Sequence, residues 1–283
     1  MNPTHTATTA PSAVDKPLGA SLLSRDRPAR PGPLAASLAF GWRALLKVKH
    51  NPQQLFDAVG FPVMTTLVFT YLFGGALAGS TREYLQFLLP GIVVLTVVMI
   101  SMNTGVALNV DIAKGVSDRF RSMPLWQPAV LVGALLGDIL RYAVAATVTV
   151  LVGLALGFRP GNGVGGVLLG LVLVVVFAFS LAWVWTVLGL AANKPEIVMN
   201  VSGLAVFPLL FLSNIFVGPN TMPGWLETAV EVNPVTRAVT ASRHAMDGTL
   251  TAGDLTAYAV TCTVLILVFG SITGVLYNGR RHS

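Results

Sequence analysis

Long apolar runs alternate with short polar segments along most of this chain. Six of the runs reach the ~20 residues that a helix needs to cross the hydrocarbon layer of a membrane. They cover residues 58–78, 85–108, 128–157, 164–191, 197–216 and 256–276, and only the third contains charged side chains. The pattern predicts an all-α polytopic membrane protein with six transmembrane helices.

The composition of the segments before the first span differs from that of the rest of the chain. Residues 1–33 are rich in Thr, Ala, Ser, Pro and Arg and lack the apolar core of a signal peptide, which predicts a disordered cytoplasmic tail. Residues 34–56 mix apolar and basic positions, which predicts an interfacial helix with Trp42 at headgroup depth and Arg43 and Lys47 towards anionic lipid. A soluble helix packed on a partner is the alternative for this segment.

A polar segment, residues 109–127, separates the second and third spans. Projected as a helix, it places Ile112, Val116, Phe120 and Met123 in one stripe and Asp111, Lys114, Asp118 and Arg121 on the opposite face, with Arg119 at the margin. Asn109 could cap the start of this helix, and Pro124 would end it. The segment is therefore either a helix lying across the cytoplasmic face or a solvated loop.

A second long segment, residues 217–255, is too polar for a full span. Its prolines at 219, 223 and 234 would divide it into short pieces, and Trp225, Leu226 and Val230 are expected to form an apolar ridge.

Composition agrees with a membrane location. Of the 283 residues, 54% are hydrophobic and only 11% are charged, against roughly 25% charged in a soluble domain. The net charge of +6 comes from basic residues at the ends of apolar runs, which favours membrane orientation over nucleic-acid binding. If both termini are cytoplasmic, 14 of the 18 Lys and Arg residues lie on the cytoplasmic side, as expected for a multi-pass protein in this orientation.

Few residues could carry chemistry. The chain has no GxxxxGK[ST] phosphate loop, HExxH or GxSxG motif, and its single cysteine is Cys262, so we expect no catalytic, cofactor or metal site in the chain itself. Asp138 is the only strong candidate for an intramembrane proton carrier. Arg141 follows it at i+3, so a structural ion pair on one helix face is the alternative.

Two long motifs resemble a known family. The sequence FLLPGIVVLTVVMISMNTGVALNVDIAKGVSDRFRSMPLWQPAVLVGALLGDILR resembles the second span, loop and third span of type-2 ABC exporter permeases, especially the daunorubicin-resistance subfamily. The later sequence SNIFVGPNTMPGWLETAVEVNPVTRAVTASR resembles the external segment of that family. The resemblance covers about residues 35–278, with Ala134 at a position where the family often has Arg.

This resemblance implies a six-span permease that works as two copies with two ABC ATPase subunits, which bind ATP and Mg. The residues that would contact the ATPase are Asp111, Lys114, Asp118, Arg119, Phe120 and Arg121 of the loop, and Trp42, Arg43 and Lys47 of the interfacial helix. The resemblance also implies that short helices in residues 217–255 re-enter the outer leaflet; a plain extracellular loop is the alternative.

The family resemblance further points to the second and fifth spans as the walls of the translocation path. The candidate residues are Asn103, Thr104, Asn200, Phe207, Phe211 and Ser213. Polar residues of this kind also bond helices to each other, and the spacings Gly133/Gly137, Gly153/Gly157 and Gly270/Gly274 could mark close helix contacts.

The sequence thus favours the permease subunit of an ATP-driven exporter that moves an amphipathic drug or natural product outward across a bacterial plasma membrane. A lipid or glycan exporter is an alternative of the same class. An ion-coupled secondary carrier and a scaffold that anchors a soluble ATPase are alternatives of other classes.

Overall fold

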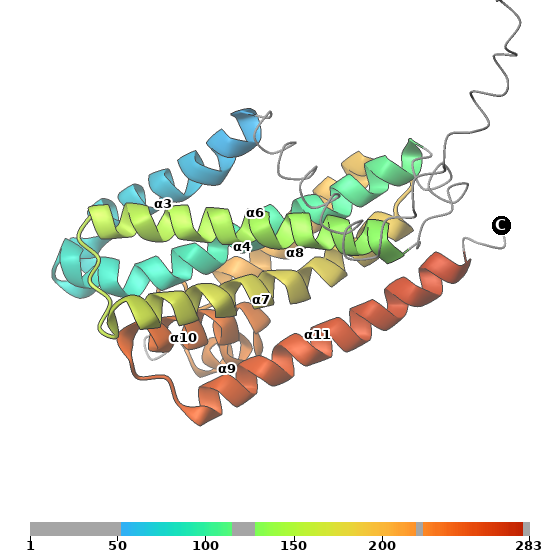
Figure 1. Ribbon diagram of the computed structural model, residues 1–283. Coiled ribbons are helices and arrows are strands. Elements are labelled where there is room, and N and C mark those ends of the chain that lie inside the picture. Colours follow the sequence, from blue (N-terminus) through green and yellow to red (C-terminus); the bar gives the residue numbers. More distant parts are fainter. Residues whose placement is uncertain (1–51, 115–127, 219–222, 280–283) are drawn as a thin grey trace, which may run out of the picture. The chain divides into compact units, whose positions relative to one another are not determined.

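The computed structural model describes residues 52–114, 128–218 and 223–279, which form eight α-helices and no strand (Figure 1). The helices are α3 (Pro52–Ala78), α4 (Thr81–Ala113), α6 (Pro128–Ala155), α7 (Gly163–Ala191), α8 (Pro195–Phe211), α9 (Gly224–Val232), α10 (Pro234–Asp247) and α11 (Ala252–Gly279). The prediction of an all-α fold is confirmed for the described residues. The predicted tail and residues 34–51 of the predicted interfacial helix lie outside them, whereas residues 52–56 form the start of α3.

Helix α4 is the centre of the packing and contacts α3, α6, α7, α8 and α10. Residues 88–98 of α4 are buried on every side of the helix. This stretch is apolar almost all round, which is typical of a helix in the core of a protein or of a membrane span. Helix α7 packs along α4, while α10 and α11 pack against α7 (Figure 1).

Among the described residues, four helical segments have the length and apolar composition to cross a membrane: Thr81–Ala113, Gly137–Ala155, Gly163–Ala191 and Ala252–Leu276. Two shorter apolar segments, Gly60–Ala76 and Pro195–Phe211, coincide with the predicted first and fifth spans. Each of the six predicted spans therefore contains a helix. The count of six membrane crossings stays a prediction.

The predicted fifth span, residues 197–216, extends beyond the helix that it contains. Helix α8 ends at Phe211, and the following residues form turns. The side chain of Asn233 donates to the carbonyl oxygens of Leu209 (2.8 Å) and Leu212 (2.6 Å), so the end of α8 is satisfied without another helical turn. A contact from a residue more than 20 positions away thus ends this helix.

The prolines of the segment 217–255 divide it as predicted where the structure describes them. Pro223 is the N-cap of α9, and Pro234 is the first residue of α10. Pro219 lies outside the described residues. The predicted apolar ridge is wrong as a single surface, because Val230 is buried while Trp225 is 75% exposed. The two residues differ by five positions, which turns them to different sides of the short helix.

The turns that we expect on the external side lie close together. Gln86, at the start of α4, donates to the carbonyl oxygen of Gly157 and accepts from the backbone N–H of Arg159 (3.1 Å). The backbone N–H of Asn162 donates to the carbonyl oxygen of Met246 at the end of α10 (2.9 Å). One end of the helical packing therefore holds the α6–α7 turn, the start of α4 and the end of α10.

Candidate functional site

The opposite end contains the part of the predicted ATPase contact that the structure describes. Asp111 is exposed in the last turn of α4, and Lys114 is its exposed C-cap. Asp118, Arg119, Phe120 and Arg121 lie outside the described residues, as do Trp42, Arg43 and Lys47. The assignment of these residues to an ATPase contact stays a prediction.

We expected Asn109 at the start of a new helix, but it lies within α4. The interpretation of Asn109 as the cap of a new helix is wrong, because α4 runs without a break from Thr81 to Ala113. No proline or glycine follows Gly105 until Gly115, so nothing in the sequence ends the helix earlier. Asn109 is only 3% exposed, and its Nδ2 donates to the carbonyl oxygens of Gly189 (2.9 Å) and Ala192 (2.7 Å) at the end of α7.

A buried polar cluster joins α4 to α6. Arg141 and Asp138 form an ion pair of 2.9 Å at i, i+3, which confirms that these two residues pair. Thr104 donates to Asp138 Oδ2 (2.8 Å), and its hydroxyl is 2.7 Å from that of Tyr142. Asp138 is thus held by a cation and a hydroxyl donor. These partners give Asp138 a structural role in joining α4 to α6.

The candidate path residues fall into two groups. Asn103, Asn200, Phe207 and Phe211 are exposed, and the last two form a stacked pair with ring centroids 4.5 Å apart. Thr104 and Ser213 are buried, and Ser213 donates to the carbonyl oxygen of Leu210 in its own chain segment. The structure therefore leaves four of the six candidates available to a ligand or a second subunit, and it commits the other two to internal contacts.

The exposed phenylalanine pair belongs to a longer row of aromatic rings. Phe216 lies 6.0 Å from Phe211 and 4.4 Å from Phe69 between ring centroids, and Phe69 stacks on Phe73 at 5.4 Å. This row connects α8 to α3. No sequence pattern predicts this row, because Phe69 and Phe216 are far apart in the chain.

Backbones of two helices meet at Gly105 and Gly189, which do not belong to the predicted glycine pairs. A Cβ on Gly105 would collide with the backbone of Trp185, and one on Gly189 would collide with the backbone of Gly105. Of the predicted glycines, Gly153 also lies at a close contact, because a Cβ there would collide with the side chain of Leu89 in α4, whereas a Cβ on Gly274 would meet nothing within 4 Å. Ser101 accepts a hydrogen bond from Trp185 Nε1 (2.8 Å) one turn away, so α4 and α7 are joined by several contacts in this region.

Arg243 joins α10 to the first part of α4 and to the turn that follows α8. Its Nε donates to the carbonyl oxygen of Phe87 and its second terminal nitrogen to that of Asn214, both at 3.1 Å. The guanidinium also lies 3.9 Å from the centroid of the Phe87 ring. Burial lowers the pKa of Arg243 to about 10, against the opposing effect of Asp247, so the side chain is charged at neutral pH. No local pattern in the sequence marks Arg243, because Phe87 lies 156 residues away in the chain.

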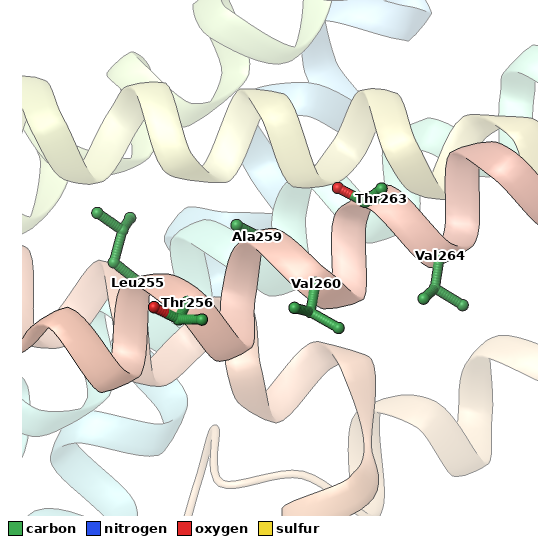
Figure 2. Close-up of a pocket in the computed structure, with 6 residues that line it drawn as sticks. All are labelled: Leu255, Thr256, Ala259, Val260, Thr263 and Val264. Carbon is green, nitrogen blue, oxygen red and sulfur yellow. The ribbon is translucent and has the colours of Figure 1, made fainter.

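An open groove of about 390 Å³ runs along α11 (Figure 2). It is lined by Leu255, Thr256, Ala259, Val260, Thr263 and Val264. The Thr256 hydroxyl donates to the carbonyl oxygen of Ala252 in the same helix. The groove offers an apolar surface without a charged group, and the described residues contain no cluster of three or more His, Cys, Asp or Glu that could hold a metal ion.

Two comparisons with known proteins bear on this arrangement. Residues 36–246 match the family model described as ABC-2 type transporter. The chain is also 47% identical, over 280 residues, to the daunorubicin resistance ABC transporter permease protein DrrB1 of Streptomyces coeruleorubidus; the match covers 97% of this chain and 99% of that protein. The earlier resemblance is confirmed, and with the apolar helices it supports a multi-pass membrane protein. This chain belongs to the ABC-2 type transporter family.

Proposed function

We propose that this chain is the permease subunit of an ATP-driven exporter that moves an amphipathic drug or natural product outward across the bacterial plasma membrane. The observation that carries the proposal is the 47% identity, over nearly the full length of both chains, to a daunorubicin resistance permease. Within this proposal, α3, α4, α6, α7, α8 and α11 are the six membrane crossings. The turns around Gly157 and Asn162 face outside, while Lys114, Lys194 and both termini face the cytoplasm.

The energy for export would come from a separate ABC ATPase subunit that binds ATP and Mg, since the chain contains no phosphate loop. We propose two copies of the permease with two copies of the ATPase. The segment that follows Lys114 would contact the ATPase through Asp118, Arg119, Phe120 and Arg121, next to Asp111 and Lys114. The helix with Trp42, Arg43 and Lys47 would form the second contact.

The exposed side chains of α4 and α8 are the proposed walls of the path. Phe207 and Phe211 are 62% and 57% exposed on α8, and Asn103 and Asn200 are also exposed. A large aromatic side chain adds apolar contact area for a flat drug, and an asparagine adds a hydrogen-bonding group. The ion pair of Asp138 with Arg141 supports a structural role for this carboxylate, which is the alternative to a proton relay.

The proposal predicts drug tolerance that depends on both subunits. Cells that express this permease together with its ATPase should grow at higher concentrations of an amphipathic polycyclic drug than cells that express either subunit alone. The combined Phe207→Ala and Phe211→Ala change should reduce this tolerance without reducing the amount of protein in the membrane. Equal tolerance with and without the permease would contradict drug export and favour a lipid or glycan cargo.

The ATPase contact can be tested by charge reversal. Asp118→Lys or Arg121→Glu should abolish co-purification of the ATPase or uncouple ATP hydrolysis from export, because like charges would replace a complementary contact. Arg82→Glu is the control, since Arg82 is an exposed charge in the first turn of the same α4, at its other end. Unchanged export in both test variants would overturn the coupling assignment.

A further inference from the structure

The side chain of Asn109 closes the end of a helix to which it does not belong. Its amide donates to the carbonyl oxygen of Gly189 in the last turn of α7 and to that of Ala192, the C-cap residue. Carbonyl groups at a helix end lack partners within the helix and need a donor from elsewhere. Here the donor is a buried residue on the last turns of α4, so the two helix ends are bonded directly to each other.

The position of this contact along the chain connects two parts of the proposed transport machinery. On one side, Asn109 lies five residues before Lys114, which is the C-cap of α4. The proposed ATPase contact follows Lys114. On the other side, Ala192 lies two residues before Lys194, which is the N-cap of α8. Only three residues join α7 to α8. Because this connection is so short, a displacement of Ala192 should also displace the start of α8.

Contacts next to Asn109 prevent α4 and α7 from sliding past each other. The backbones meet at Gly105 and Gly189 with no room for a Cβ on either residue. Closely packed backbones of this kind carry displacements between sites because they cannot deform continuously. A movement of the end of α4 must therefore move the end of α7 with it.

Asn109 also has an unused acceptor. Its Oδ1 is buried and has no hydrogen-bond partner among the described residues. A buried polar atom without a partner costs about 1–3 kcal/mol, so a hydrogen bond to this oxygen would be favourable. The free oxygen can accept a backbone N–H if the α7–α8 connection shifts.

We propose that Asn109 is a positioning residue that transmits movement of the ATPase-facing segment through the end of α7 into α8, and so into the walls of the path. This inference rests on the proposed function, because it requires an ATPase at the end of α4. It adds a residue and a route that lie between the ATPase contact and Phe207 and Phe211.

The test compares two variants in proteoliposomes that contain the permease and its ATPase. Asn109→Ala removes both donations to the end of α7, and the matched control Ser101→Ala removes the bond to Trp185 between the same two helices. Both variants should retain the ATPase and melt at a lower temperature. Asn109→Ala alone should lower the number of drug molecules exported per ATP hydrolysed, by about fivefold or more, the lower end of typical coupling between sites.

Several outcomes would overturn the inference. An unchanged ratio of export to hydrolysis in Asn109→Ala would do so, and so would an equal fall in Ser101→Ala, which would show a general packing effect. If the unaltered protein fails to retain an ATPase or exports without ATP, the proposed function itself fails. If export is coupled to ATP hydrolysis both in the unaltered protein and in Asn109→Ala, the proposed function holds and only the role of Asn109 is wrong.

A second measurement does not depend on the folding of a variant at Asn109. Spin labels at Ala113, Lys194 and Thr249 occupy exposed positions, with Cys262 replaced by Ser. On ATP binding, the distance between labels at 113 and 194 should stay constant, while both should change their distance to the label at 249. A change between 113 and 194 as large as the other two would show that the ends of α4 and α7 move independently and would overturn the inference.

Discussion

Helices α4 and α7 cross so closely at Gly105 that one added methyl group should force them apart. A Cβ on this residue would lie against the carbonyl oxygen of Trp185 and 2.9 Å from its carbonyl carbon. Ordinary contact begins at 3.4 Å, so the backbones must separate by at least 0.5 Å, the difference between the two distances. Because the opposing atoms belong to the backbone, no rotation of a side chain can relieve the contact.

The expected cost of Gly105→Ala is that of overpacking a tight core, about 1–3 kcal/mol. Alanine also favours a helix over glycine by about 1 kcal/mol, which would partly hide this cost. Gly274→Ala in α11 is the matched control, because a Cβ there meets nothing within 4 Å. Both variants gain the same helix preference, so the difference in stability between them isolates the crossing of α4 and α7.

The assay is thermal unfolding of the purified protein in detergent, followed by tryptophan fluorescence. At about 2–4 °C per kcal/mol for a chain of this size, Gly105→Ala should melt about 2–12 °C below Gly274→Ala. Gly274→Ala should melt at or above the temperature of the unaltered protein. If Gly105→Ala melts at the same temperature as Gly274→Ala, the two helices do not cross as closely as described.

Three further changes test other contacts by the same unfolding assay. Asp138→Ala leaves Arg141 without its anion and should cost about 3–5 kcal/mol, and the additional change Arg141→Met should recover part of this loss; no recovery would show that the pair is not the cause. Asn233→Ala leaves two carbonyl groups at the end of α8 without donors and should cost about 1–3 kcal/mol; faster hydrogen exchange at residues 209–212 would confirm where the loss occurs. Arg243→Lys keeps the charge but cannot reproduce a planar group that bonds two carbonyls and stacks on a ring, so it should melt clearly below the unaltered protein; equal stability would contradict this role.

The features that were predictable from the sequence are those that depend on neighbouring residues. An apolar run of sufficient length predicts a helix wherever it occurs, which is why all six predicted spans contain one. The pair Asp138 and Arg141 follows from a spacing of three residues on one helix. The breaks at Pro223 and Pro234 follow from the geometry of proline, which favours the start of a helix over its interior.

The contacts that the sequence did not predict join residues far apart in the chain. Asn109 and Ala192 are 83 residues apart, and Phe87 and Arg243 are 156 residues apart. No periodicity within one helix shows which distant carbonyl a side chain will reach. Asn109 illustrates the difficulty, since an asparagine before a polar segment is typical of a helix start, and only the continuous packing of α4 on α7 shows that the helix does not end there.

The most direct test of the proposed function is the energy source for transport. Inverted membrane vesicles that contain this permease and its ATPase should accumulate the drug only when ATP is supplied. Accumulation should continue after an ionophore collapses the proton gradient, because ATP hydrolysis by the partner subunit is the proposed energy source. Accumulation without ATP that disappears with the proton gradient would contradict the ATP-driven exporter and support an ion-coupled carrier.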